Sequence, residues 1–155
     1  MAPETFVIEV YWDDFSPKTV SIFGSYLLTK ENIIAFGQEY DPLPHHISEE
    51  TAVDSPIGTL CASGIQGVGI AHKILCDNLL KKSALVAGRG FEEMIVHRPI
   101  LPNQYLTISM EVLSCVPHKY KQDRGWVNYK VQLIAADERK LLSYKAEVLF
   151  LKRPL

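Results

Sequence analysis

Residues 39–52, EYDPLPHHISEETA, place several groups that can exchange protons within one short, proline-containing segment. Asp41 and the adjacent His45 and His46 lie between a helix-like run and an apolar stretch. An imidazole with an ordinary pKa of about 6.5 can give or take a proton near neutral pH, and a carboxylate can act as a base. The segment is therefore either a loop that turns the chain or part of an active site.

Two simpler interpretations of this segment compete with catalysis. Asp41 followed by Pro42 can end a helix, because a proline disfavours helical conformation in the residue before it. Two histidines in a row can suggest a metal site, but neighbouring side chains point apart in most backbone geometries and no third ligand has a diagnostic spacing. We therefore expect no metal site.

Helical signals flank the segment on both sides. Thr29 can cap a helix over residues 30–39, and Ser48 can start a second, brief helix with acidic residues in its first turn. Residues 62–82, ASGIQGVGIAHKILCDNLLKK, have the length of a long helix. Its first half is small or apolar on nearly every side, so we expect it to be surrounded by protein.

Three glycines, Gly64, Gly67 and Gly69, lie in the first half of this long helix. Each costs up to about 1 kcal/mol relative to alanine, so close packing against a sheet or a substrate is the expected reason for them. They superficially resemble a dinucleotide-binding loop, but the glycine order is reversed and no strand precedes them.

The hydrophobic pattern changes to a period of two after residue 85, which is typical of half-buried antiparallel strands. We expect strands around residues 86–98, 106–112, 127–133 and 142–150. Helices come first and strands last, and each strand needs one covered face. The simplest packing is a single α+β domain over residues 1–155, in which an antiparallel sheet wraps around the long helix.

Composition limits the class of function. The chain has 155 residues, of which 47% are hydrophobic and 22% charged, so neither disorder nor a fibrous repeat is expected. A net charge of −2 gives no reason to expect binding to nucleic acid or to a membrane. There is no secretory signal pattern, and Cys61, Cys76 and Cys115 form no CxxC pair. We expect free thiols and a cytoplasmic location.

The segment FGQEYDPLPHHISEETA, followed by SPIGTLCASG, resembles the MaoC-like acyl dehydratase and (R)-specific enoyl-CoA hydratase family, which has the hotdog fold. The hydratase motif of that family has an aspartate, then a proline, then a histidine five residues after the aspartate. Asp41, Pro44 and His46 match this spacing, and Ser63-Gly64 matches the small-residue pair that opens the central helix. The resemblance covers roughly residues 25–152.

The resemblance implies reversible addition of water to a trans-2-enoyl thioester carried by coenzyme A or an acyl carrier protein. Asp41 and His46 would share one water, deprotonating it as it attacks C3 and protonating C2. The backbone N–H of Gly64 would meet the charge that develops on the thioester carbonyl, and Ser63 would help to orient the substrate. No cofactor is implied, since coenzyme A or phosphopantetheine is part of the substrate.

The resemblance also implies a homodimer, because hotdog subunits commonly pair their sheets edge to edge. The sequence departs from the hydratase pattern at three places: Leu43 replaces an asparagine, His45 is unusual, and Asn103-Gln104 replaces a Gly-Asp turn. These departures leave the substrate class open. A hotdog thioesterase and a non-catalytic module that binds acyl thioesters therefore stay open as alternatives.

Residues outside the motif have simple explanations. Four cations could meet the phosphates of the carrier, although an ordinary charged rim explains them equally well. They are Arg98, Lys119, Lys121 and Arg124. Three further histidines are expected to be structural or solvated: His72 in the long helix, His97 at a strand end and His118 in a polar loop.

Overall fold

One antiparallel sheet of five strands, in the order β1-β3-β4-β5-β2, forms the frame of the protein. The structure is a computed structural model that describes residues 1–155. Strands β1 and β2 form the two edges of the sheet. The strands are β1 (Val20–Leu28), β2 (Leu85–Val96), β3 (Gln104–Pro117), β4 (Arg124–Ile134) and β5 (Lys140–Leu151).

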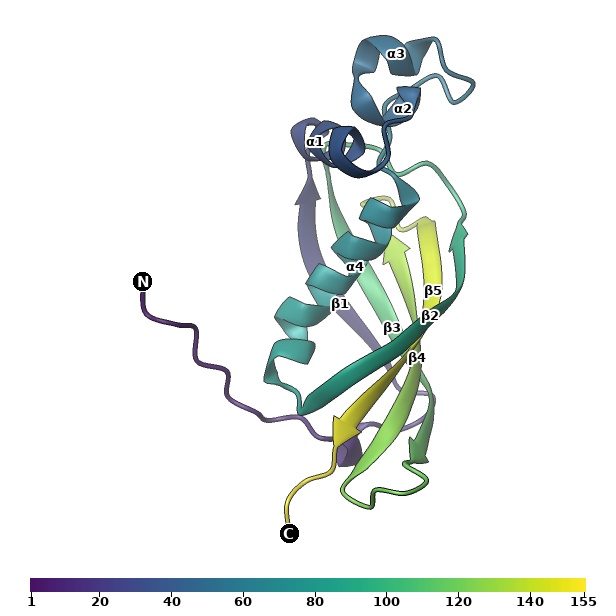
Figure 1. The fold of residues 1–155 in the computed structure, drawn as a ribbon. Helices are drawn as coiled ribbons and strands as arrows, with labels where there is room; N and C mark the ends of the chain where they lie inside the picture. Colours follow the sequence, from purple (N-terminus) through teal and green to yellow (C-terminus); the bar gives the residue numbers. More distant parts are fainter.

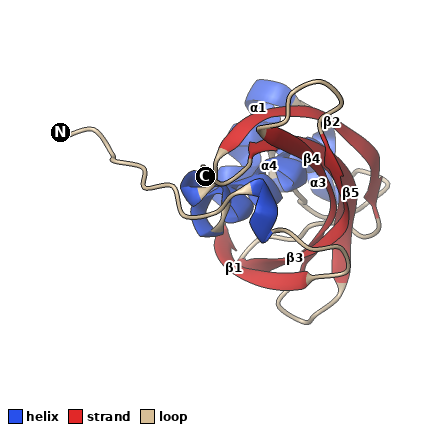
Figure 2. Cartoon of the chain, turned by 90° about the horizontal axis from the view of Figure 1, so that it is seen from below, coloured by secondary structure: helices blue, strands red, loops and turns tan.

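The sheet curves around one long helix, α4 (Gly64–Asn78), as seen along the helix in Figure 2. Three shorter helices gather beyond the N-terminal end of α4 (Figure 1). They are α1 (Lys30–Tyr40), α2 (Pro44–Ile47) and α3 (Glu49–Val53), and short 3-10 turns lie at Trp12–Asp14 and Leu80–Lys82. The predicted α+β hotdog architecture is therefore confirmed.

The core lies between α4 and the concave face of the sheet. Alternate residues of β3 and β4 point into it, as the period of two predicts, and they meet the buried side of α4 at Ile70, Ala71, Ile74 and Leu75. A Cβ on Gly67 would lie 2.7 Å from Ile100 and 3.1 Å from Leu142. This glycine is needed because it lets the helix approach the sheet closely.

Two details of the predicted elements are wrong. Strand β1 precedes the helices, so the order of helices first and strands last does not hold. It is an edge strand with an irregular register between Gly24 and Tyr26, and such a strand lacks a clean alternation. The long helix is also shorter than residues 62–82, because Ser63 caps its start and it ends at Asn78.

The expectation that protein surrounds α4 holds on one side only. Gly64 and Gly67 pack closely against neighbouring side chains, but nothing lies within 4 Å of a Cβ placed on Gly69. Ile65, on the same open side, is 60% exposed. The sheet covers one side of the helix, which leaves the opposite stripe uncovered in a single chain. None of the helices combines the length and the apolar character that crossing a membrane requires.

Candidate active site

The end of α1 places Asp41. This residue caps the C-terminus of the helix, and its backbone N–H donates to the carbonyl of Gly37 at 2.9 Å. Pro42 follows, so the helix stops where the sequence predicts that it stops. The carboxylate is thereby held at a fixed point between α1 and the next short helix.

Helix α2 places His46, although this stretch was expected to be a loop. Pro44 is its first residue, where the fixed φ of proline suits the start of a helix and its missing N–H costs nothing. A Cβ on Gly37 would overlap the backbone carbonyl of His46. Helices α1 and α2 therefore touch only because residue 37 is glycine, and this contact sets the distance between the two members of the pair.

A backbone carbonyl fixes the tautomer of His46. The Nδ1 atom lies 2.6 Å from the carbonyl oxygen of Cys61, and the residue is only 6% exposed. A carbonyl oxygen can only accept, so Nδ1 carries the proton of the neutral ring and Nε2 carries the lone pair. The neutral imidazole therefore presents a basic nitrogen toward Asp41.

The two side chains face each other. The Nε2 atom of His46 lies 3.6 Å from Oδ2 of Asp41, which is too long for a direct hydrogen bond. At this separation one water can lie within hydrogen-bond distance of both atoms. The Asp41 side chain keeps 25% of its surface exposed while that of His46 keeps 8%, so the pair is open to solvent mainly through the carboxylate.

Ser63 joins the pair to the start of α4. Its hydroxyl donates to Oδ2 of Asp41 at 2.6 Å and accepts from the N–H of Ile65 at 3.3 Å. Ser63 is 1% exposed, so its side chain is enclosed by protein. The hydroxyl holds the carboxylate against the N-terminus of the helix, and its expected role in orienting a substrate stays a prediction.

Gly64 is the first residue of α4. The first amides of a helix have no partner within the helix, and the helix dipole makes this end positive. A Cβ here would lie 2.9 Å from a methyl of Val96 and 3.0 Å from the terminal methyl of Met94. The absence of a side chain thus lets β2 pack closely against the start of the helix.

Gly64 and His46 open into the same cavity, which has a volume of about 290 Å³. The other lining residues come from the α2 region, from the segment before α4 and from the end of β2. They are His45, Ile57, Cys61, Ala62, Val96, His97, Arg98, Pro99 and Ile100. The four residues singled out in the sequence, Asp41, His46, Ser63 and Gly64, are therefore adjacent in space.

Two lining residues, His45 and His97, were not expected at the site, whereas Arg98 was expected there only as a candidate contact to the phosphates of the carrier. His97 was assigned to solvated surface, yet its Nε2 lies 2.8 Å from the hydroxyl of the buried Ser143. Burial lowers the pKa of His45, as does the neighbouring ring of His46. Arg98 donates to the backbone carbonyl of Lys140 at 2.9 Å. The only signal in the sequence that could have placed His97 at the cavity is its position just before the proline that ends the strand.

Of the remaining polar candidates, Cys61 lines the cavity and supplies the carbonyl that holds His46, whereas His118, Cys76 and Cys115 lie elsewhere. His118, which the sequence assigns to solvated surface, accepts from two amides in its own loop, at 3.0 Å and 3.1 Å. Cys61, Cys76 and Cys115 are free thiols, and burial raises the pKa of each. No three His, Cys, Asp or Glu side chains converge as a set of metal ligands.

Comparisons with known proteins give the following. No family model matches the sequence. The uncharacterized protein YdeM of Bacillus subtilis (strain 168) is 29% identical over 107 residues, which are 69% of this chain and 76% of that protein. A MaoC-like dehydratase from Rhodospirillum rubrum superposes with a TM-score of 0.85 at 26% identity, over 95% of this chain and 100% of its own. The R-hydratase PhaJ1 from Pseudomonas aeruginosa gives 0.76 at 14% identity, over 97% and 92%.

Proposed function

We propose that this hotdog domain, which resembles the MaoC-like dehydratases and (R)-hydratases in motif and in fold, is a hydro-lyase that adds water reversibly to a trans-2-enoyl thioester. One observation carries the proposal. A carboxylate and an imidazole face each other across 3.6 Å, and the imidazole shares a cavity with the first amide of α4. The two side chains fit general acid–base chemistry on one water, and the amide fits a developing oxyanion.

The water is positioned by two acceptors. The carboxylate of Asp41 and the unprotonated Nε2 of His46 can each accept one hydrogen of the same water molecule. The lone pair of its oxygen then points away from both and attacks C3 of the enoyl group. One O–H bond breaks as the new C–O bond forms, and the dyad delivers a proton to C2. The product is a 3-hydroxyacyl thioester, and the same steps in reverse release water.

The negative charge that forms on the thioester oxygen needs a donor. The N–H of Gly64 supplies it, and the positive end of the 15-residue helix α4 adds a favourable field. Ser63 acts in the proposal through the carboxylate of Asp41, which it holds by a hydrogen bond of 2.6 Å. In the proposal, Ser63 acts mainly by holding Asp41, and a direct contact between Ser63 and the substrate is the lesser part of its role.

The substrate carrier is coenzyme A or an acyl carrier protein, and the thiol group of either enters as part of the substrate. The reaction moves one water and one proton, so it calls for no redox or metal group. Leu43, where the hydratase motif has asparagine, directly precedes α2 and is 48% exposed. The leucine side chain cannot form a hydrogen bond to the substrate. Asp41 and His46 therefore hold the water without help from this position.

A homodimer through β2 is part of the proposal. Every residue of this edge strand is exposed in the single chain, although half of its twelve are large and apolar. They are Leu85, Val86, Phe91, Met94, Ile95 and Val96. An uncovered apolar edge invites pairing, and a second copy would continue the sheet. Sedimentation that shows only monomer at micromolar concentration would contradict this part.

The function is tested with a panel of trans-2-enoyl-CoA substrates of different lengths. Loss of the ultraviolet absorbance of the enoyl group measures hydration, and a thiol reagent measures release of free coenzyme A. The proposal predicts loss of absorbance without thiol release. Thiol release would identify a thioesterase, and saturable binding without either signal would identify a binding module.

A further inference from the structure

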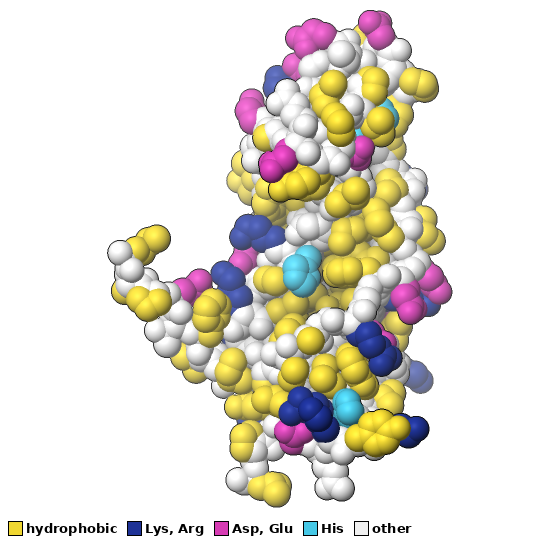
Figure 3. Space-filling model, in the orientation of Figure 1, with side chains coloured by type: hydrophobic (Ala, Val, Ile, Leu, Met, Phe, Trp, Pro, Cys, Tyr) yellow, Lys and Arg dark blue, Asp and Glu magenta, His cyan; other side chains and the backbone are white.

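The largest cavity of the protein lies apart from the Asp41–His46 pair and takes no part in the mechanism above. It has a volume of about 780 Å³, within the usual range for small-molecule sites. The C-terminal half of α4, strands β2, β4 and β5 and the N-terminal segment line it, and hydrophobic side chains gather around the open hollow on this face (Figure 3). Phe6, Ile8, Leu80, Leu85, Phe91 and Val148 supply most of the apolar lining.

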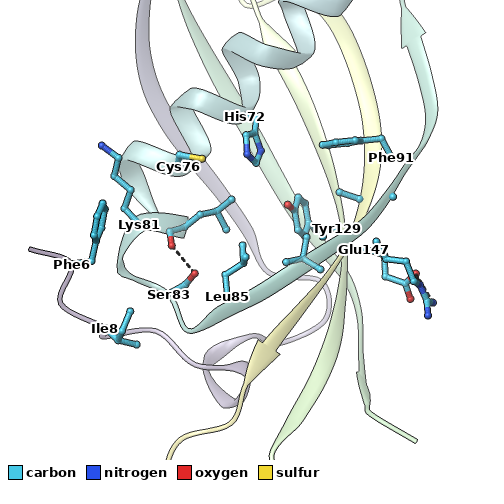
Figure 4. Close-up of a pocket in the computed structure, with 16 residues that line it drawn as sticks. Phe6, Ile8, His72, Cys76, Lys81, Ser83, Leu85, Phe91, Tyr129 and Glu147 are labelled. Carbon is cyan, nitrogen blue, oxygen red and sulfur yellow. Dashed lines mark hydrogen bonds and ion pairs between the residues drawn. The ribbon is translucent and has the colours of Figure 1, made fainter. Parts of the chain in front are cut away.

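A polar atom without a partner lies at this cavity. The Nδ1 atom of His72, which lines it, is buried and makes no hydrogen bond. The hydroxyl of Tyr144 is also buried and unpaired, but Tyr144 does not line the cavity. Tyr144 is 1% exposed and packs against Phe91, with the ring centroids 5.2 Å apart. Tyr129, also 1% exposed, extends from the sheet toward α4, and its hydroxyl is turned toward the ring of His72 (Figure 4). Buried polar atoms without partners are rare and need an explanation.

The cavity is electrically neutral. Burial lowers the pKa of His72 and raises that of Tyr129, so near neutral pH the imidazole is uncharged and the phenol keeps its proton. The charged residues at the rim are already paired. Arg89 lies 2.6 Å from Glu147, and Lys81 lies 3.1 Å from a carboxylate oxygen of Asp77. The polar groups therefore suit a neutral hydrogen-bonding partner and not an ion.

Two glycines keep one wall of the cavity open. Gly88 and Gly90 line it from β2, and nothing lies within 4 Å of a Cβ placed on either. Glycine inside a strand weakens the strand and often marks the close approach of a ligand. The register of β2 against β5 shifts between Gly88 and Gly90, so a β-bulge accounts for glycine here, and the missing side chains also leave this wall of the cavity open.

The cavity lies along the same two elements as the candidate active site. Gly64 opens α4 at one end and His72 follows eight residues later, which is about 12 Å along the helix. Strand β2 contributes Val96 to the smaller cavity and Phe91 to the larger one. A medium-length acyl group attached to a thioester at Gly64 has the reach to enter the larger cavity.

We propose that the 780 Å³ cavity receives the distal part of the acyl group and selects acyl groups that carry a neutral hydrogen-bonding group, a hydroxyl or a carbonyl, far from the thioester. Tyr129 and His72, which both line the cavity, supply the hydrogen bonds. This inference rests on the proposed function for the identity of the ligand as an acyl thioester.

The test measures binding separately from turnover. Titration calorimetry compares decanoyl-CoA with ω-hydroxydecanoyl-CoA, neither of which can be hydrated, on the full-length protein. One gained hydrogen bond predicts about fivefold tighter binding of the hydroxylated probe. Tyr129→Phe removes a hydroxyl and keeps the ring, and we expect it to bring the two dissociation constants together. Tyr120→Phe, at a tyrosine that is 79% exposed, is the matched control and keeps the preference.

The outcomes separate the two proposals. Equal dissociation constants for both probes on the wild-type protein overturn the cavity inference, as does a preference that survives Tyr129→Phe together with His72→Leu. Hydration of trans-2-decenoyl-CoA by the wild-type protein, followed by absorbance, tests the proposed function on its own. A protein that hydrates the substrate without the preference keeps its function and loses the cavity role. A protein that has the preference but does not hydrate the substrate keeps the cavity role and loses the proposed function.

Discussion

Replacing Gly64 by proline removes one backbone N–H from the candidate site while leaving the helix able to start. Proline is tolerated at the first position of a helix, because the N–H there has no intrahelical partner. Ser63 has φ of −57° and ψ of 144°, a conformation that a following proline favours. The Gly64→Pro variant therefore tests the amide as an oxyanion donor more directly than a side-chain deletion does.

The expected loss follows from the role assigned to the amide. Removing one oxyanion donor typically lowers kcat by about 10²–10³, which corresponds to about 3–4 kcal/mol of transition-state stabilisation. Gly64→Ala is the matched control because it keeps the N–H and adds a Cβ at the same place, 2.9 Å from Val96 and 3.0 Å from Met94. The alanine variant measures the steric part of the effect, and the ratio of the two variants measures the donor.

The assay follows the enoyl absorbance of a trans-2-enoyl-CoA under saturating substrate, with thermal unfolding as a check that both variants fold. We expect the proline variant to have a kcat about 10² or more below that of the alanine variant. Two folded variants whose kcat values agree within tenfold would refute the assignment of the oxyanion donor.

Three further predictions concern the supports of the site and the response to pH. Gly37→Ala should lower the free energy of unfolding by about 1–3 kcal/mol, because the new methyl overlaps the backbone of α2. Gly69→Ala, where the space is open, should raise it by about 0.5–1 kcal/mol. Urea denaturation compares the two variants, and equal stability would contradict the contact between α1 and α2. Ser63→Ala should remove about 1 kcal/mol of helix capping and lower kcat through the carboxylate that it holds; an effect on KM alone would instead assign the hydroxyl to the substrate. Burial lowers the folded-state pKa of His72, so the unfolded chain binds its proton first as pH falls below about 6.5, and stability is lost there. Between pH 8 and pH 5, the midpoint of thermal unfolding should fall less for His72→Leu than for the wild type. An equal fall in both would show that protonation of His72 does not cause the loss of stability.

The sequence predicts elements well where a local signal decides them. Thr29 and Ser48 cap helices as expected, since capping depends on neighbouring residues. The alternating strands β3, β4 and β5 are present because one face of each meets the core, whereas β2 is exposed along its whole length. Strand β1 was missed because it is an edge strand, and its place beside β3 depends on a partner 76 to 91 residues away in the sequence. Sequence pattern does not encode that distance.

The candidate site shows the same division. The spacing of Asp41 and His46 was visible because a single short turn positions both. The carbonyl of Cys61 that fixes the imidazole, and Ser143 that holds His97, could not be predicted, because each depends on how distant segments pack. The expected close packing of Gly69 is wrong for a related reason: a glycine does not reveal whether the surface that it faces is covered.

The most direct test of the central claim is the rate of enoyl-CoA hydration by Asp41→Asn and His46→Ala beside the wild type, with the fold of each variant checked by circular dichroism. If the two side chains activate one water, each variant should lose about 10²–10⁴ in kcat, the usual contribution of general acid–base catalysis, while remaining folded. Wild-type turnover in both folded variants would contradict the account.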